Sequence, residues 1–143
     1  MSAFYSIYVI LDAPLNEKNI THIFQCGIDL GFIIYDKYDN PNDIYIKSLD
    51  NKQATSTLLK LLEADENDLY NAYFTVKFED TDFSMRLDPD NGHMQLGIFA
   101  LSFPWTRSVD DDNRTIDFAR YIRLLLALCK DFSILEIKTT RDL

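Results

Sequence analysis

The chain has 143 residues, the size of one ordinary domain, and 47% of them are hydrophobic. This is enough to bury a core without support from disulfides or structural metal ions. Its 23 acidic and 14 basic side chains give a net charge of −9. This charge repels phosphate backbones and anionic lipids, so we expect no nucleic-acid or membrane partner and instead a basic protein partner. Neither a membrane span nor a signal peptide is indicated, which predicts a cytoplasmic protein.

The first half of the chain predicts a strand, a helix, two strands and a helix, at residues 4–11, 16–30, 32–35, 44–46 and 50–64. The first strand is apolar on both faces, which is typical of a central strand. Gly31 suits the left-handed residue after the end of the first helix. Asp50 and Gln53 have the spacing of a capping box, which predicts the start of the second helix.

The second half begins with a predicted meander of three antiparallel strands, at residues 72–78, 83–87 and 94–103. Apolar and polar residues alternate along the first two strands, which indicates one buried face. Residues 79–82 are short enough for a hairpin connection. In the second connection, Pro89 presets φ for a type I turn, and Asn91 and Gly92 tolerate positive φ.

A helix is predicted from about residue 113 to 130, followed by a strand at 133–138. Asp110, Asp111 and Asp112 precede this helix and are expected to cap its amino terminus. Its core face is expected to consist of Phe118, Ala119, Ile122, Leu125, Leu126 and Cys129. Three further apolar side chains lie on or beside the polar face and are either covered by a second layer or form an oligomer contact patch: Tyr121, Leu124 and Leu128.

The element order β-α-β-β-α-β-β-β-α-β mixes hairpins with helices. This order predicts a single α+β domain over residues 1–143, with a mostly antiparallel mixed sheet and helices mainly on one face.

No catalytic motif stands out in the sequence. His22 and His93 lack a neighbouring nucleophile that either could activate. Cys26 and Cys129 lie in helical patterns and are expected to be small buried hydrophobic residues, with a disulfide or metal site as the alternative. Asp88, Asp90 and Gly92 fail the calcium-loop pattern. We therefore expect a protein that is not an enzyme and has no cofactor, no catalytic residues and no metal site.

Acidic residues and two aromatic residues lie close together in the sequence. Aromatic anchors ringed by like charges are typical of surfaces that capture a basic partner. We predict a partner-binding surface made of Glu79, Asp80, Asp82, Asp88, Asp90, Phe103, Trp105, Asp110, Asp111 and Asp112. In the alternative interpretation, Phe103 and Trp105 fold into the core and the acidic residues only solubilise the domain.

The general layout resembles the small acidic immunity proteins that bacteria make against polymorphic and contact-dependent toxins. The resemblance lies in the short α+β layout, the negative charge, the turn at Phe103-Pro104-Trp105, and the ending that runs from residues 117–122 through 134–137. It implies a protein that binds one cognate toxin, often a basic nuclease, and occludes its active site. The resemblance is one of general layout, so it does not assign a binding role to any individual residue of this chain.

One other hypothesis comes from a different class, and a third option, a homodimer, is compatible with either hypothesis. The chain could be a small ligand-binding domain or enzyme with a cleft beside the 72–103 meander, using Asp88, Asp90 or His93 at its rim. It could also form a homodimer through Tyr121, Leu124 and Leu128 or through an exposed edge strand.

Overall fold

The computed structural model describes residues 4–35, 48–64, 73–100 and 105–142. Their elements, in chain order, are β1 (Phe4–Leu11), α1 (Glu17–Leu30), β2 (Ile33–Tyr35), β3 (Ser48–Leu49), α2 (Asn51–Ala64), β4 (Tyr73–Phe78), β5 (Thr81–Asp90), β6 (His93–Ala100), β7 (Thr106–Ser108), β8 (Arg114–Ile116), α3 (Phe118–Leu128) and β9 (Ile134–Asp142). The strand predicted at 44–46 lies outside the described residues.

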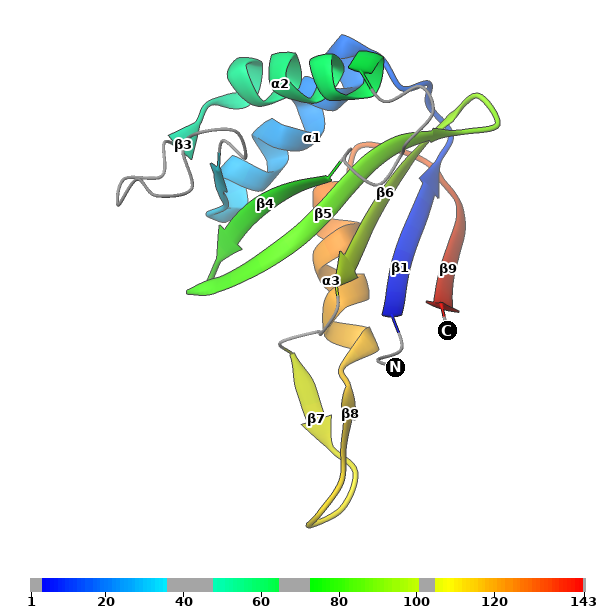
Figure 1. Cartoon of the computed structure of the whole chain (residues 1–143). Coiled ribbons are helices and arrows are strands. Elements are labelled where there is room, and N and C mark those ends of the chain that lie inside the picture. The colour runs from blue at the N-terminus through cyan, green and yellow to red at the C-terminus, as the bar shows by residue number, and fades with distance from the viewer. Residues whose placement is uncertain (1–3, 36–47, 65–72, 101–104, 143) are drawn as a thin grey trace.

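Seven strands form one sheet in the order β3-β2-β4-β5-β6-β1-β9, and every neighbouring pair is antiparallel. The predicted central position of the first strand is confirmed, because β1 pairs with β6 on one side and β9 on the other. Strands β7 and β8 form a separate two-stranded hairpin that projects from the body (Figure 1). The α+β class and the largely antiparallel sheet are confirmed, and the hairpin is an addition to the predicted order.

The helices lie on one side of the sheet (Figure 1) and enclose a continuous hydrophobic core. The sheet contributes inward-facing side chains such as Val9, Leu87 and Leu96, which are fully buried. Helix α1 contributes Ile20 and Phe24, which pack into the same core. Burial of this apolar area is the main force that holds the helices to the sheet.

The predicted carboxyl end of α1 and the predicted start of α2 are confirmed. Gly31 follows α1 with φ 108°, in the left-handed region that favours glycine. At the start of α2, the Gln53 N–H donates to Asp50 Oδ1 at 2.8 Å, and the Asp50 N–H donates to Gln53 Oε1 at 3.0 Å. These reciprocal bonds form a capping box and satisfy two amides at the helix start.

Both meander connections are tight turns, and the two residues predicted to tolerate positive φ in the second connection, Asn91 and Gly92, adopt it. Positive φ angles occur at Glu79 and Asp80 in the first turn, and at Asn91 and Gly92 in the second. Positive φ at both central residues is the requirement of the type I′ turns that join antiparallel strands with their natural twist. The predicted type I turn at Pro89 is therefore wrong, and Pro89 belongs to β5, where it pairs with Met94.

The sheet face away from the helices carries a close contact between Tyr8 and Gly97. These residues are cross-strand partners in β1 and β6. A Cβ atom at residue 97 would lie 2.2 Å from the Tyr8 ring, so only glycine lets the ring lie against the neighbouring strand.

Helix α3 begins later and is rotated relative to the prediction. Its N-cap is Asp117, whose side chain accepts from the Arg120 N–H at 3.2 Å. The prediction that Asp110, Asp111 and Asp112 cap this helix is wrong, because the residues after them pair as β8 with β7.

The buried face of α3 consists of Tyr121, Leu124, Leu125 and Leu128. Ala119, which was predicted in the core, is exposed. The hydrophobic pattern could not fix the face, because apolar residues surround most of this helix.

A helix needs about 20 apolar residues to cross a bilayer core. None of the helices in the described parts of the chain combines that length with the required hydropathy.

Candidate partner-binding surface

The acidic turns of the meander lie at opposite ends of β5. Glu79 and Asp80 form the turn before this ten-residue strand, and Asp90 is its last residue. With a rise of about 3.3 Å per residue, the strand separates the two groups by about 30 Å. The predicted single surface containing all of them is therefore wrong.

Trp105 lies in the core, with 7% of its surface exposed. Its ring contacts Phe83 edge to face at a centroid distance of 4.8 Å and Tyr121 at 4.9 Å. Its backbone N–H donates to the Tyr121 hydroxyl at 2.7 Å. The prediction of Trp105 as an exposed anchor is wrong, the alternative of a core tryptophan is confirmed, and Phe103 lies outside the described residues.

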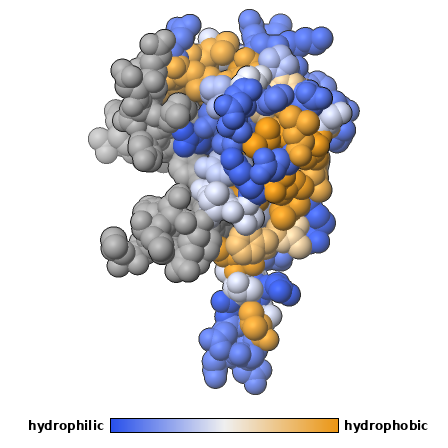
Figure 2. Space-filling model, turned by 90° about the vertical axis from the view of Figure 1, so that its right-hand side faces the viewer, coloured by the Kyte–Doolittle hydropathy of each residue, from blue (hydrophilic) through white to orange (hydrophobic). Residues whose placement is uncertain are grey.

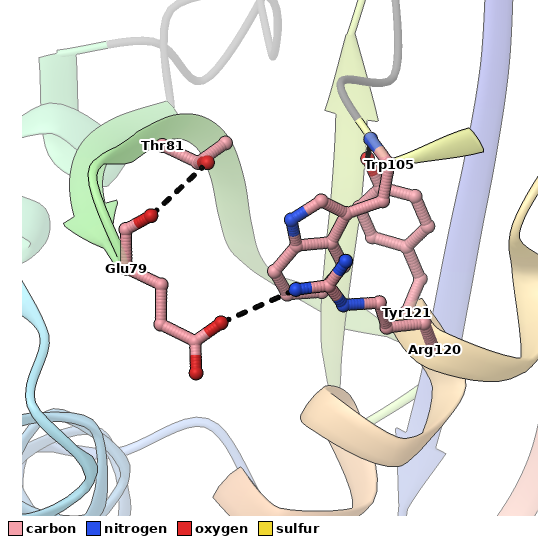
Figure 3. Close-up of polar contacts among 5 residues, drawn as sticks. All are labelled: Glu79, Thr81, Trp105, Arg120 and Tyr121. Atoms are coloured by element: carbon pink, nitrogen blue, oxygen red, sulfur yellow. Dashed lines mark hydrogen bonds and ion pairs between the residues drawn. The ribbon is translucent and has the colours of Figure 1, made fainter.

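Arg120 covers the outer side of Trp105 (Figure 3). The guanidinium carbon of Arg120 is 3.9 Å from the centroid of the Trp105 ring, a cation–π contact. Arg120 Nη2 also lies 3.2 Å from Glu79 Oε2. The chain's own arginine therefore engages one of the predicted partner-binding carboxylates.

Trp105 anchors the base of the β7–β8 hairpin. Its carbonyl accepts from the Asp117 N–H at 3.1 Å, so the chain enters and leaves the hairpin at one buried point. Beyond this base, all residues of β7 are exposed. Figure 2 shows the hairpin as an arm that is mostly hydrophilic with a small hydrophobic area.

The tip of this arm carries Asp110, Asp111 and Asp112, all exposed, beside Val109, which is 63% exposed. An apolar side chain of this size beside three carboxylates offers both contact area and charge to a partner. The structure brings these three predicted residues together and separates them from the meander turns.

Hydrogen bonds within the loop hold the tip in shape. The Asp110 carboxylate accepts from the backbone N–H groups of Asp112 and Asn113, at 3.0 and 2.9 Å, and from the Asn113 side chain. These bonds lower the pKa of Asp110 below its ordinary value, and the bonds from the Asn113 side chain have the largest effect. At the base, Arg114 Nε donates to Thr106 Oγ1 at 2.7 Å.

The side chains of Asp111 and Asp112 are not used in this way. Neither makes a hydrogen bond or ion pair with any residue that the structure describes. Asp110 therefore shapes the loop, and Asp111 and Asp112 present their charges to solvent.

Asp88 is buried on the sheet face away from the helices, with 5% of its surface exposed. Its Oδ2 lies 2.8 Å from Arg86 Nε, an ion-pair contact in which the N–H direction does not meet hydrogen-bond geometry. Its Oδ1 accepts from Gln95 at 3.2 Å. Burial raises the pKa of Asp88, and the Arg86 charge opposes that shift. The prediction that Asp88 contacts a partner is wrong, because the residue is engaged inside the chain.

The predicted oligomer patch is also wrong, because Tyr121, Leu124 and Leu128 are all in the core. Exposed apolar side chains instead lie on β9, at Ile134, Leu135 and Ile137. Strand β9 is an edge of the sheet, so its outer backbone groups are unpaired within the described residues.

Two pockets lie between the helices and the sheet, away from the meander rim. Each has a cavity volume of about 10 Å³, room for about one water molecule, and core side chains such as Phe24 and Phe74 line both. His93 is at the rim, 3.9 Å from Asp12. The ligand-binding or enzyme hypothesis remains a prediction.

The structure also brings together His22, Cys26 and Asp131, which the sequence analysis did not connect. The only sequence signal was the spacing of four residues between the histidine and the cysteine, which places them on one helix face. Both cysteines are buried and free, as expected. Burial raises the pKa of Cys26, and it raises that of Cys129 to about 12, so neither thiol has the low pKa of a nucleophile.

Comparisons with protein-family models, with curated proteins and with solved structures find no match to this chain.

Proposed function

We propose that this chain is an immunity-type binding protein that neutralises a basic toxin enzyme, and that the β7–β8 hairpin is its main contact. The observation that carries the proposal is the exposed arm with Asp111 and Asp112 at its tip, neither of them bonded through its side chain to any residue that the structure describes. An isolated two-stranded hairpin has marginal stability in water. Anchoring through Trp105 and the bonds to Asp110 supply the order that a preformed contact needs.

The proposed mechanism is occlusion. The carboxylates at the tip occupy positions that substrate phosphates take in the groove of a basic enzyme, and Val109 packs against its wall. The net charge of −9 raises the rate of encounter with a positively charged partner by roughly 10 to 1000-fold at low salt. Such a role requires no bond-making chemistry, and it places the protein in the cytoplasm with its target.

The test uses the full chain and the product of the adjacent gene. We expect a complex in titration calorimetry and protection of cells that express that product. Failure to form a complex, together with no protection, would refute the proposed function.

A pair of matched variants tests the role of the hairpin. Asp111→Asn/Asp112→Asn should slow association by about ten-fold at low salt, because two steering charges are lost at the contact. Asp29→Asn/Glu63→Gln removes two exposed charges from α1 and α2 and should change the rate far less. Equal effects of the two double variants would assign the contact to another surface while leaving the function in place.

A homodimer joined along β9 is a separate proposal, supported by the exposure of Ile134, Leu135 and Ile137 on an edge strand. Two β9 strands could pair antiparallel and extend the sheet. Sedimentation velocity at several concentrations should show a dimer that Leu135→Lys abolishes. A monomer at all concentrations would remove this proposal.

A further inference from the structure

A histidine, a cysteine and a carboxylate meet where α1 passes the end of α3. His22 and Cys26 are one turn apart on α1, and Asp131 lies in the turn that follows α3. His22 Nε2 is 2.6 Å from Asp131 Oδ2, and Cys26 Sγ is 4.0 Å from the same oxygen. The three potential ligand atoms all lie within 4.8 Å of one another.

Neighbouring contacts hold these groups in place. The His22 ring packs edge to face on Phe132, at a centroid distance of 5.6 Å. The Phe132 N–H donates to the Cys129 carbonyl at 2.9 Å, which fixes the turn that carries Asp131. Cys26 is buried, whereas the side chains of His22 and Asp131 are about half exposed. The cluster therefore combines a fixed inner ligand with two outer ligands that can adjust.

Two simpler roles explain less of this arrangement. A half-exposed histidine–aspartate pair accounts for the 2.6 Å contact, but it gives no reason for a cysteine beside the same oxygen. A Cys-His-Asp nucleophilic triad needs the histidine between the other two groups. Here the aspartate oxygen lies between them.

We propose that His22, Cys26 and Asp131 bind one Zn²⁺ ion, with the fourth position open to solvent or to another ligand. Zinc takes sulfur, nitrogen and oxygen ligands in tetrahedral geometry, with bond lengths of about 2.0–2.3 Å. Those lengths place neighbouring ligand atoms about 3.4–3.6 Å apart. The histidine–aspartate pair now at 2.6 Å must open, and the cysteine–aspartate pair at 4.0 Å must close slightly. The histidine and cysteine ligand atoms, which lie within 4.8 Å of each other, must also reach this separation, and the half-exposed His22 and Asp131 side chains allow these changes.

The ligand set also selects the metal. Mg²⁺ and Ca²⁺ prefer ligand sets made of oxygen, whereas a thiolate with an imidazole suits Zn²⁺. The proposed zinc site lies beyond the carboxyl end of α3, and the hairpin lies before its amino end. The proposal therefore does not depend on the proposed function.

The experiment uses the full chain after treatment with a chelator and a reductant. Titration calorimetry should show one Zn²⁺ per chain. With Co²⁺ as the probe, a thiolate-to-cobalt charge-transfer band should appear in the near ultraviolet, together with visible bands of tetrahedral intensity. Zn²⁺ should also raise the melting temperature.

Variants assign the ligands. Cys26→Ser should abolish the charge-transfer band, and His22→Ala and Asp131→Asn should each weaken zinc binding by about 100-fold or more, since even outer-shell changes cost 10 to 100-fold. Cys129→Ala and His93→Ala are the matched controls and should retain both the band and the affinity. Circular dichroism confirms that each variant is folded.

No zinc uptake by the folded chain would overturn the proposal. Unchanged affinity in His22→Ala or Asp131→Asn would overturn the three-ligand site. Loss of the band in Cys129→Ala but not in Cys26→Ser would assign the sulfur ligand elsewhere and would also overturn it.

Discussion

The seven-stranded body and the β7–β8 hairpin are stabilised in different ways. The body encloses fully buried side chains such as Leu96 and Leu125, and its strands are bonded along their length. The hairpin is exposed along β7 and is held by its buried base at Trp105 and by polar contacts around Asp110. We infer that changes in the body alter stability, whereas changes at the hairpin tip alter binding and leave the fold intact.

The largest effect is expected inside the body, at Asp88. Asp88→Ala removes the carboxylate that faces Arg86, whose side chain is 14% exposed, and leaves that cation without its partner. The free energy of unfolding should fall by about 3 kcal/mol, measured by urea denaturation. The double variant Arg86→Leu/Asp88→Leu should recover most of this loss, because no buried charge remains. A loss below about 0.5 kcal/mol in Asp88→Ala would show that this pair is effectively solvated.

High pH should lower the free energy of unfolding of the seven-stranded body. Burial raises the pKa of Tyr121 to about 12, whereas the unfolded chain has the ordinary value near 10. Between these values the unfolded chain releases its proton first, so the free energy of unfolding falls as pH rises from about 10 to 12. The wild type should lose about 2–3 kcal/mol relative to Tyr121→Phe over this range. Parallel pH profiles of the two proteins would contradict the expectation.

A smaller effect is expected where the hairpin joins the body. At neutral pH, Tyr121→Phe removes the hydroxyl that accepts from the Trp105 N–H and leaves this amide buried without that acceptor. The free energy of unfolding should fall by about 1–2 kcal/mol. Trp105 is the only tryptophan of the chain, so its fluorescence reports the hairpin base directly. An unchanged emission spectrum together with unchanged stability would mean that this bond does not anchor the hairpin.

The smallest effect on global stability is expected at the hairpin tip. Asp110→Ala removes the acceptor for the amides of Asp112 and Asn113, so their hydrogen exchange should become faster. The global unfolding transition should not change, because the tip is exposed and lies outside the core. Asp111→Ala is the control, since its side chain bonds to none of the described residues. Faster unfolding or a lowered transition in Asp110→Ala would show that the tip and the body unfold together.

The sequence predicted the local features of the fold well. The capping box at Asp50, the left-handed Gly31 and the central position of residues 4–11 are all confirmed. Each depends on neighbouring residues or on apolarity along one strand. The hairpin at 106–116 was missed, although β-branched residues such as Thr106 and Ile116 flank a run of turn formers. The aspartates of that run suit both a hairpin turn and a helix cap, and the prediction of a helix cap was wrong.

The candidate surfaces were predicted less well, because side-chain exposure depends on the whole fold. An aspartate is usually exposed, and a tryptophan is a common anchor in binding surfaces, yet Asp88 and Trp105 are both buried. Tyr121 lies on a helix that is apolar around most of its circumference, so its direction is set by tertiary contacts such as those with Trp105 and Phe83. Proximity in sequence did not imply proximity in space, since one long strand separates the two acidic turns.

The sequence by itself determined the α+β class, the meander and the negative charge, because these follow from short-range pattern and composition. Only the tertiary structure decided which of the described acidic residues are exposed and which are buried. It also brought Asp131 to His22, 109 residues away in the chain. The physical reason is that packing of the helices on the sheet fixes which distant side chains meet, and no local spacing encodes that contact.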